Sequence, residues 1–357
     1  MNVLVVGGGA AGLSTAGALA HRGIRAVVLE QDGEIGARWA GRYERLHLHT
    51  VRRYSGLAHY PLPRELPKYV SKDQYAGYLR EYAEHFRLDV RLGQSVQKIA
   101  PAASGWSVAT ANGGWRSEVV VLATGAHDLP VIPAWPGADG YGGRLLHSSE
   151  YRSGREFAGS DVLVVGLGNS GAEIAADLVE QGAARTAVSV RTTPPITRRE
   201  LMGVPVQLLG IAFARFPPRV VDSVGSVLRR IGTGDLTPYG LGNADWGPFV
   251  AHRPPLIDVG FLDHLKSGRI DVLPAVTGFT ASGVTFADGR SETFDTVIAA
   301  TGFRNALPEL LDLPDPLATT HAGLYLIGFR DSVRGALFEI DRHSRRLAST
   351  ISGSLAA

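Results

Sequence analysis

One pattern occurs twice along this chain and constrains its fold most: an apolar run, a glycine-rich turn, a helical stretch and a second apolar run. The matching segments are residues 3–6 and 162–165, then Gly7-x-Gly9-x-x-Gly12 and Gly166-x-Gly168-x-x-Gly171, and last the closing runs 119–125 and 296–302, which both end in Ala-Thr-Gly. A buried strand, a helix and another buried strand form a parallel βαβ unit. We therefore expect an α/β fold with two Rossmann-like dinucleotide-binding domains in tandem.

The first glycine turn has a physical reason for each of its glycines. Gly7 permits a tight turn, Gly9 lets the backbone approach a pyrophosphate, and Gly12 lets the helix pack closely on the strand. The free N–H groups at the start of that helix attract phosphate. Glu30 ends the second apolar run, where its carboxylate can hold both hydroxyls of an adenosine ribose. The alternative is a structural glycine turn without a ligand.

The second glycine turn predicts a different dinucleotide. Its second strand ends in Arg191 and Thr192 rather than in an acid. A guanidinium and a hydroxyl can hold a 2′-phosphate that a carboxylate would repel, so this site predicts NADPH. Arg198 and Arg199 are alternatives for the same phosphate, and Arg191 can also be an ordinary solvent-exposed arginine. Two dinucleotide sites in one chain suggest electron transfer between two cofactors, NADPH and a tightly held FAD.

Composition removes several classes of protein. The chain has no cysteine, which excludes disulfides, an internal dithiol electron acceptor and cysteine-ligated metal, and we expect no metal site. The formal charge of +2 is too balanced for a dedicated nucleic-acid binder. We expect no membrane span, because no apolar stretch approaches about 20 residues. The first apolar run meets glycines too early for a signal peptide, which favours a cytoplasmic protein.

Two helices outside the repeats can be predicted. Ser71 and Gln74 form a capping-box pattern that opens a helix with an aromatic face. Residues 220–231 form a second amphipathic helix, which we expect to pack on the core; a lid or a membrane-surface contact is the alternative.

Three motifs carry a family resemblance, namely Tyr141-x-Gly143-x-x-x-His147-x-x-x-Tyr151, Gly36-Ala37-Arg38-Trp39 and Thr301-Gly302-Phe303. The chain resembles the flavin-containing monooxygenases of the two-dinucleotide-domain type. Matching stretches at residues 45–49, 239–241, 247–248, 255–260 and 267–270 are closest to the auxin-biosynthesis (YUCCA-like) enzymes and their bacterial relatives. Tyr141 departs from the usual phenylalanine of the family. Tyr141 and His147 can serve as a structural hinge or contact NADP.

The resemblance implies a fold and a reaction. Residues 1–155 and 303–357 should form an FAD-binding domain into which an NADPH-binding domain, 156–302, is inserted. Reduced flavin would react with O2 to give a C4a-(hydro)peroxyflavin that transfers one oxygen atom to a small organic substrate. That transfer is N- or S-oxygenation, or attack on a carbonyl or 2-oxo acid. The alternative is an NADPH oxidase or flavin reductase that passes electrons to O2 or a partner, and a homodimer is left open.

The resemblance also implies site residues. His49 is the candidate catalytic hydrogen-bond donor, although a structural histidine is equally consistent, and His47 is its competitor in register. A substrate carboxylate would need a cation such as Arg52 or Arg53. The expected cofactor contacts, including the residues already derived from the two turns, are Gly7, Gly9, Gly12, Glu30, Arg38, Trp39, His47, Val96, Thr124, Gly125, Gly166, Gly168, Asn169, Ser170, Gly171, Arg191, Thr192, Thr301 and Asp341.

Overall fold

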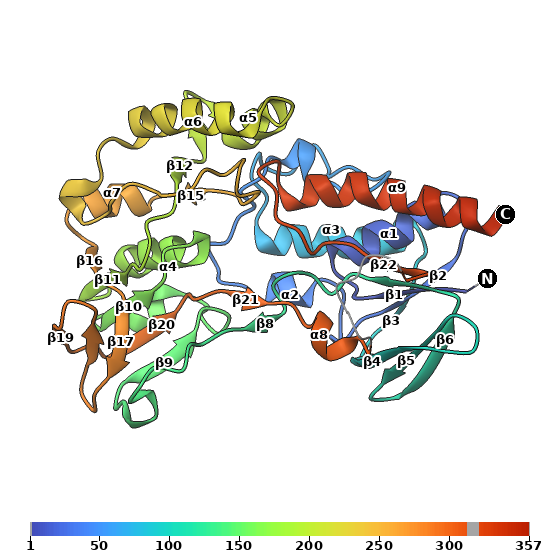
Figure 1. The fold of residues 1–357 in the computed structure, drawn as a ribbon, viewed down its shortest axis with the longest axis horizontal. Helices are drawn as coiled ribbons and strands as arrows, with labels where there is room; N and C mark the ends of the chain where they lie inside the picture. The colour runs from blue at the N-terminus through green and yellow to red at the C-terminus, as the bar shows by residue number, and fades with distance from the viewer. Residues whose placement is uncertain (1, 313–320, 357) are drawn as a thin grey trace. The chain divides into compact units, whose positions relative to one another are not determined.

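The computed structural model describes residues 2–312 and 321–356 and divides the chain into two compact units (Figure 1). Unit 1 contains the described residues of 1–42, 46–129 and 303–357, and unit 2 contains 43–45 and 130–302. Within the described part of the chain, no helix is long and apolar enough to cross a membrane.

Unit 1 is built on a parallel sheet of five strands. Their order is β22 (Leu324–Leu326), β7 (Val119–Leu122), β1 (Val3–Val6), β2 (Ala26–Leu29) and β3 (Asp89–Arg91). Both β1 and β7 are buried along their whole length, which explains their unbroken apolar sequences. Helices α1 (Ala10–Ala20), α3 (Lys72–His85) and α9 (Ala336–Ala356) pack beside this sheet, with α9 along α1 (Figure 1).

The other face of the same sheet packs against a three-stranded antiparallel sheet. It consists of β4 (Val96–Pro101), β5 (Trp106–Thr110) and β6 (Gly113–Ser117). Ile99, Trp106 and Val108 from this sheet join Val120 and Leu122 of β7 in one apolar cluster. The central strands are therefore covered on both sides.

Unit 2 repeats this plan. Its parallel sheet has the order β16 (Asp271–Leu273), β11 (Arg185–Ser189), β10 (Asp161–Val165), β20 (Thr296–Ala299) and β9 (Arg144–His147). Helix α4 (Asn169–Glu180) follows β10, as α1 follows β1. A three-stranded antiparallel sheet packs against this sheet and consists of β17 (Val276–Phe279), β18 (Val284–Phe286) and β19 (Ser291–Glu292). The expected pair of Rossmann-like units is confirmed.

Strand order shows how one unit is inserted in the other. The edge strand β22 comes from the end of the chain and completes the unit 1 sheet beside β7. The equivalent edge strand of unit 2, β9, precedes β10 in sequence and pairs with β20. Residues 130–155 thus belong to unit 2, whereas the sequence-based boundary placed them in the first domain. Pairing of β9 is a long-range contact that local patterns do not reveal.

Further helices, turns and strands lie outside these four sheets. The helices are α2 (Ala37–Ala40), α5 (Val206–Phe213), α6 (Pro218–Thr233), α7 (Phe261–Lys266) and α8 (Leu307–Leu310), with 3-10 turns at Arg52–Tyr54, Ala138–Gly140, Gly154–Phe157 and Thr237–Tyr239. The remaining strands are β8 (Leu129–Pro130), β12 (Ile196–Arg198), β13 (Glu200–Leu201), β14 (Val204–Pro205), β15 (Leu256–Asp258) and β21 (Phe303–Arg304). The capping box of α3 is present as expected. The expectation that α6 packs its apolar stripe on the core is wrong, because that stripe is exposed.

Candidate functional site

The first glycine turn joins β1 to α1 and tolerates no side chain at two positions. Gly7 has φ +105°, and a Cβ there would lie 2.7 Å from the carbonyl oxygen of Ala123. A Cβ on Gly12 would lie 1.8 Å from the carbonyl oxygen of Gly7. Gly9, by contrast, has open space where its Cβ would be, and no side chain caps the helix that it opens. The start of α1 is therefore shaped to receive a phosphate on backbone N–H groups.

Glu30 lies beside this turn, at the carboxyl end of β2. Its side chain is buried, and its two oxygens accept hydrogen bonds from the N–H of Gly8 at 2.6 Å and of Asp32 at 2.9 Å. Burial raises the pKa of this carboxyl above its ordinary value, and the two N–H donors oppose that rise. The side chain is thus held in one orientation next to the turn, with lone pairs left for ribose hydroxyls.

Two further predicted contacts surround the turn. Thr124 and Gly125 follow β7, the strand that pairs with β1, and the Thr124 hydroxyl is buried without a hydrogen-bond partner among the described residues. A buried hydroxyl without a partner costs free energy that a ligand can recover. Val96 is the first residue of β4. The N–H of Gln94, two residues earlier, donates to the backbone carbonyl of Glu30, so the start of β4 lies close to Glu30. An open turn, an oriented acid and this hydroxyl fit FAD.

The predicted flavin-contacting segment is α2. Arg38 is bound by two acids, Asp128 at 2.8 Å and Asp32 at 3.7 Å, so its guanidinium is positioned by unit 1 itself. Trp39 meets the buried ring of Tyr75 edge-on at 4.7 Å. Asp128 was not singled out from the sequence, although it stands shortly after Thr124 and Gly125.

The two candidate histidines lie on one short segment. Leu48 between them is buried in the core of unit 1, and its N–H donates to the carbonyl of Val70. His47 is exposed and lies opposite Ser71 in an isolated bridge, whereas His49 is half-buried with a buried Nδ1. His49 is therefore the more enclosed of the two.

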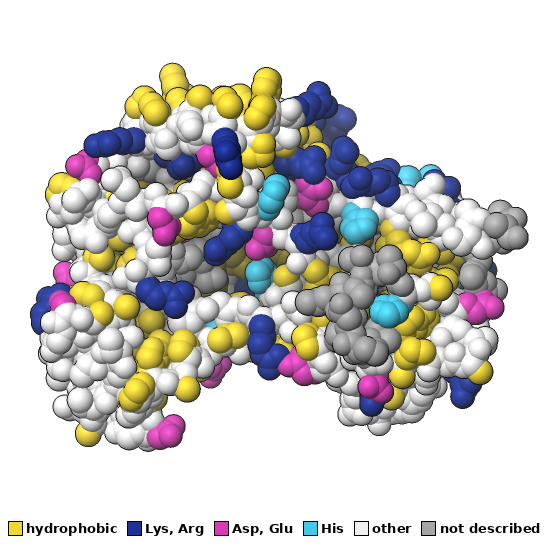
Figure 2. All heavy atoms as spheres, viewed as in Figure 1, with side chains coloured by type: hydrophobic (Ala, Val, Ile, Leu, Met, Phe, Trp, Pro, Cys, Tyr) yellow, Lys and Arg dark blue, Asp and Glu magenta, His cyan; other side chains and the backbone are white. Residues whose placement is uncertain are grey.

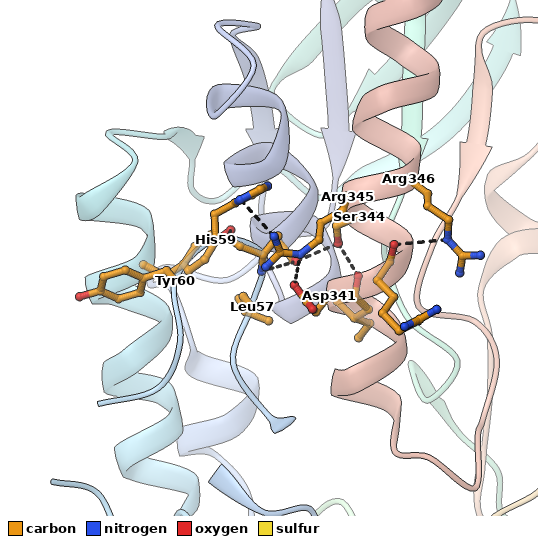
Figure 3. Close-up of polar contacts among 12 residues, drawn as sticks. Leu57, His59, Tyr60, Asp341, Ser344, Arg345 and Arg346 are labelled. Carbon is orange, nitrogen blue, oxygen red and sulfur yellow. Dashed lines mark hydrogen bonds and ion pairs between the residues drawn. The ribbon is translucent and has the colours of Figure 1, made fainter. Parts of the chain in front are cut away.

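Asp341 lies in α9 and already has a partner. Its Oδ1 accepts a hydrogen bond from Nε of Arg345 at 2.7 Å, as Figure 3 shows. Arg345 also donates to Nδ1 of His59 at 3.1 Å. Ser344 binds Ser14 at 2.8 Å and so fastens α9 to α1. In the described structure, Asp341 positions Arg345; a contact with the cofactor remains a prediction.

The second glycine turn reproduces the first. Gly166 has φ +105°, and its Cβ would lie 2.6 Å from the carbonyl oxygen of Ala300. A Cβ on Gly171 would lie 2.1 Å from the carbonyl oxygen of Gly166, while the position of Gly168 is open. No side chain caps α4, which starts at Asn169 and Ser170. This turn too fits a dinucleotide phosphate.

Two predicted contacts near this turn have partners within unit 2. Asn169 Oδ1 accepts the N–H of Ile257 at 2.7 Å, which ties α4 to β15 and leaves the amide Nδ2 as a donor. The Thr301 hydroxyl donates to the carbonyl of Val131, unlike the Thr124 hydroxyl in the equivalent position.

The arginines proposed for the 2′-phosphate differ in their surroundings. Arg198 donates to Asp263 at 2.9 Å and lies 3.9 Å from the buried Asp258. Arg191 and Thr192 are exposed and follow β11 after one intervening residue, and Arg191 makes no ion pair with any residue that the structure describes. The charge of Arg191 is therefore available for a ligand, whereas that of Arg198 is neutralised by the two acids.

The Tyr141–Tyr151 motif has structural roles inside unit 2. The Tyr141 hydroxyl donates to the carbonyl of Phe294 at 2.6 Å. His147 accepts the N–H of Ser149 on Nδ1, so its Nε2 carries the proton and donates to the carbonyl of Gly302 at 3.0 Å. These contacts connect the motif to the residues on either side of β20, because Phe294 precedes the strand and Gly302 follows it.

Tyr151, the last residue of the motif, is buried. Its hydroxyl donates to Oδ2 of Asp177 at 2.6 Å, and the same oxygen accepts the N–H of Gly154 at 2.9 Å. Burial, followed by the Asp177 hydrogen bond, raises the pKa of Tyr151 far above its ordinary value, so the phenol stays protonated. Among the described residues, no group of three or more histidines and acids is placed to hold a metal ion.

Comparison with known proteins agrees with this geometry. Residues 4–200 match the family model described as pyridine nucleotide-disulphide oxidoreductase. The chain is 38% identical to indole-3-pyruvate monooxygenase YUCCA1 of Oryza sativa subsp. japonica, across 99% of this chain and 89% of the relative. It is 37% identical to YUCCA4 of the same plant, across 85% of this chain and 74% of the relative.

Solved structures share the fold. A mutant of the flavin monooxygenase from Stenotrophomonas maltophilia superposes with a TM-score of 0.78 at 24% identity, over 99% of this chain and 98% of that one. Cyclohexanone monooxygenase from Rhodococcus sp. Phi1 bound to NADP+ gives 0.76 at 16% identity, over 99% and 84%. The sequence likeness to the plant enzymes and the two glycine turns lead to one assignment: the chain belongs to the YUCCA-like class B flavin monooxygenases and is an FAD- and NADPH-dependent monooxygenase.

Proposed function

We propose that this chain transfers one oxygen atom from O2 to a small organic substrate, at the expense of NADPH, and that 2-oxo acids are the first substrate class to test. The observation that carries the proposal is the 38% identity over 99% of the chain to a relative named for its action on indole-3-pyruvate. N- or S-oxygenation of a soft nucleophile is the competing chemistry.

Unit 1 would hold FAD. The start of α1 would bind the pyrophosphate, Glu30 the ribose hydroxyls, and Thr124 a polar group that satisfies its buried hydroxyl. Bound FAD supplies the hydride acceptor and the centre at which O2 is activated. Arg38 is held by Asp128, so its guanidinium would have a fixed position from which to contact the bound FAD. Gly125, Trp39 and Val96 would complete these contacts.

Unit 2 would hold NADPH. The start of α4, with Ser170 and the free amide nitrogen of Asn169, would bind the pyrophosphate. Arg191 and Thr192 would bind the 2′-phosphate, because their neighbour Arg198 is already neutralised. Thr301 would contribute through its backbone, since its hydroxyl donates to Val131.

We assign the oxygen-transfer step a hydrogen-bond donor, His49. Its ring is more enclosed than that of His47, and enclosure excludes water from a reacting group. A neutral imidazole can donate one hydrogen bond to an oxygen atom in such a place. The His49→Ala variant is expected to keep FAD and NADPH binding and to divert electrons into H2O2, whereas His47→Ala stays coupled.

The test compares NADPH consumption with product. Purified FAD-loaded protein is given NADPH, O2 and either aryl-2-oxo acids, such as indole-3-pyruvate, or amines and thioethers of similar size. Substrate-dependent NADPH consumption with matching decarboxylated product, detected by mass spectrometry, supports the proposal. If only the amines or thioethers gave oxygenated product, they would replace the 2-oxo acids as the proposed substrate class. NADPH consumption that ends entirely in H2O2 with every class would instead favour an NADPH oxidase or flavin reductase.

A further inference from the structure

Helices α5 and α6 of unit 2 present an apolar surface to solvent, and its function is a separate question from oxygen transfer. This surface, the α5–α6 ridge, consists of Phe213, Phe216, Val220, Val224, Val227, Leu228 and Ile231. Ile231 is 76% exposed and Val227 59%. Figure 2 shows apolar side chains protruding in a row over these helices. A surface helix normally turns such a stripe toward the core.

Helix α6 is held in this orientation by its polar side. Asp222 accepts the N–H groups of Phe249 at 3.1 Å and Val250 at 2.8 Å. The carbonyl of Thr233, at the end of α6, accepts a hydrogen bond from Lys266 at 2.6 Å. Arg229 is on the side of α6 that faces the protein, and its burial lowers the pKa of the guanidinium. Rolling the helix to bury its valines would break these contacts. The exposed stripe is therefore a property of the fold.

The charge around the ridge indicates what covers it. Residues 206–233 contain four arginines and one aspartate, a net charge of +3, whereas the whole chain carries only +2. The single acid, Asp222, faces inward onto two N–H groups. Arg219 and Arg230 are exposed beside the stripe. An apolar stripe flanked by arginines is the pattern of a helix that lies in the headgroup region of an anionic bilayer.

We propose that the α5–α6 ridge is a peripheral membrane-binding surface for anionic lipid. The valines, Ile231 and the two phenylalanines would enter the acyl boundary, and Arg219 and Arg230 would lie among the phosphates. A second copy of the chain is less suited to this surface, because two such faces would bring their arginines together. The proposal does not depend on which substrate the enzyme oxidises.

The test is co-sedimentation of the FAD-loaded full chain with vesicles of phosphatidylcholine, alone or with about 30% phosphatidylglycerol. Wild-type protein is expected to sediment with the anionic vesicles and to be released when salt is raised from about 50 to 500 mM. The Val224→Gln/Ile231→Gln variant should bind about tenfold more weakly. Ile132→Gln, which alters an isoleucine 43% exposed elsewhere in unit 2, is the matched control and should bind like wild type.

A second variant, Arg219→Gln/Arg230→Gln, should lose the preference for anionic vesicles while all of its apolar stripe remains. Flavin absorbance and circular dichroism check that each variant is folded, and the salt titration of wild type needs no variant. Failure of wild type to sediment with anionic vesicles overturns the proposal. The proposal is also overturned if light scattering shows that the wild type is a homodimer and that the Val224→Gln/Ile231→Gln variant is a monomer, since the ridge would then join two copies of the chain.

Discussion

Replacing Arg191 by alanine tests the second dinucleotide site most directly. Arg191 follows β11, is exposed, and makes no ion pair within the described part of the chain. Its loss therefore removes no contact that stabilises the described fold. Arg198 is held by Asp263 and Asp258, so it is not expected to replace the missing guanidinium.

The magnitude follows from the chemistry of one charge-assisted contact. A hydrogen bond to a charged group contributes about 1.5–3 kcal/mol, and solvent exposure of Arg191 places it at the lower end. Since about 1.4 kcal/mol corresponds to a factor of ten, the KM for NADPH should rise about tenfold. NADH lacks the 2′-phosphate, so its KM should change little.

The assay is steady-state NADPH and NADH oxidation by wild type, Arg191→Ala and the control Arg198→Ala. Arg198→Ala removes the cation that lies 3.9 Å from the buried carboxylate of Asp258, so it should lower the melting temperature rather than change the preference between nucleotides. An equal rise in KM for both nucleotides in Arg191→Ala would refute the phosphate assignment. A specific loss of NADPH in Arg198→Ala would move the assignment to that residue.

Three further predictions concern buried polar groups. Thr124→Val should keep or raise the melting temperature of the apoprotein, because it removes a buried hydroxyl that has no partner among the described residues, and it should weaken FAD binding, measured by flavin fluorescence. Thr301→Val loses a hydrogen bond and should lower the melting temperature; the opposite ranking of the two variants would contradict the fit to FAD. Tyr151→Phe should reduce the free energy of unfolding by about 1.5–3 kcal/mol in urea titrations, since it leaves a buried carboxylate oxygen of Asp177 with one donor fewer; no change would remove the structural role of this residue. The pKa of Glu30 is raised in the folded protein, so the folded protein binds this proton more tightly than the unfolded chain. The free energy of unfolding of the apoprotein should therefore fall as the pH rises from the ordinary value of 4.5 through the raised pKa. Glu30→Gln should remove this pH dependence, and an unchanged dependence in the variant would contradict the reasoning.

The sequence alone determined the parts of this protein whose causes are local. Gly12 and Gly171 are required because a Cβ would lie 1.8 and 2.1 Å from a carbonyl oxygen of the preceding turn, and such constraints leave a readable motif. The unbroken apolar runs reveal strands covered on both faces. The capping box of α3 is equally local. The presence of two Rossmann-like units follows from these signals.

Only the tertiary structure decided features that depend on distant partners. Thr124 and Thr301 occupy the same position in the two Ala-Thr-Gly tripeptides. The Thr124 hydroxyl has no partner among the described residues, whereas the Thr301 hydroxyl donates to the carbonyl of Val131. The start of unit 2 at residue 130 depends on pairing between β9 and β20. The periodicity of α6 shows that one side of the helix is apolar, but it does not show which side faces solvent. The N–H groups of Phe249 and Val250 donate to Asp222 and hold the polar side of the helix inward, which leaves the apolar side exposed.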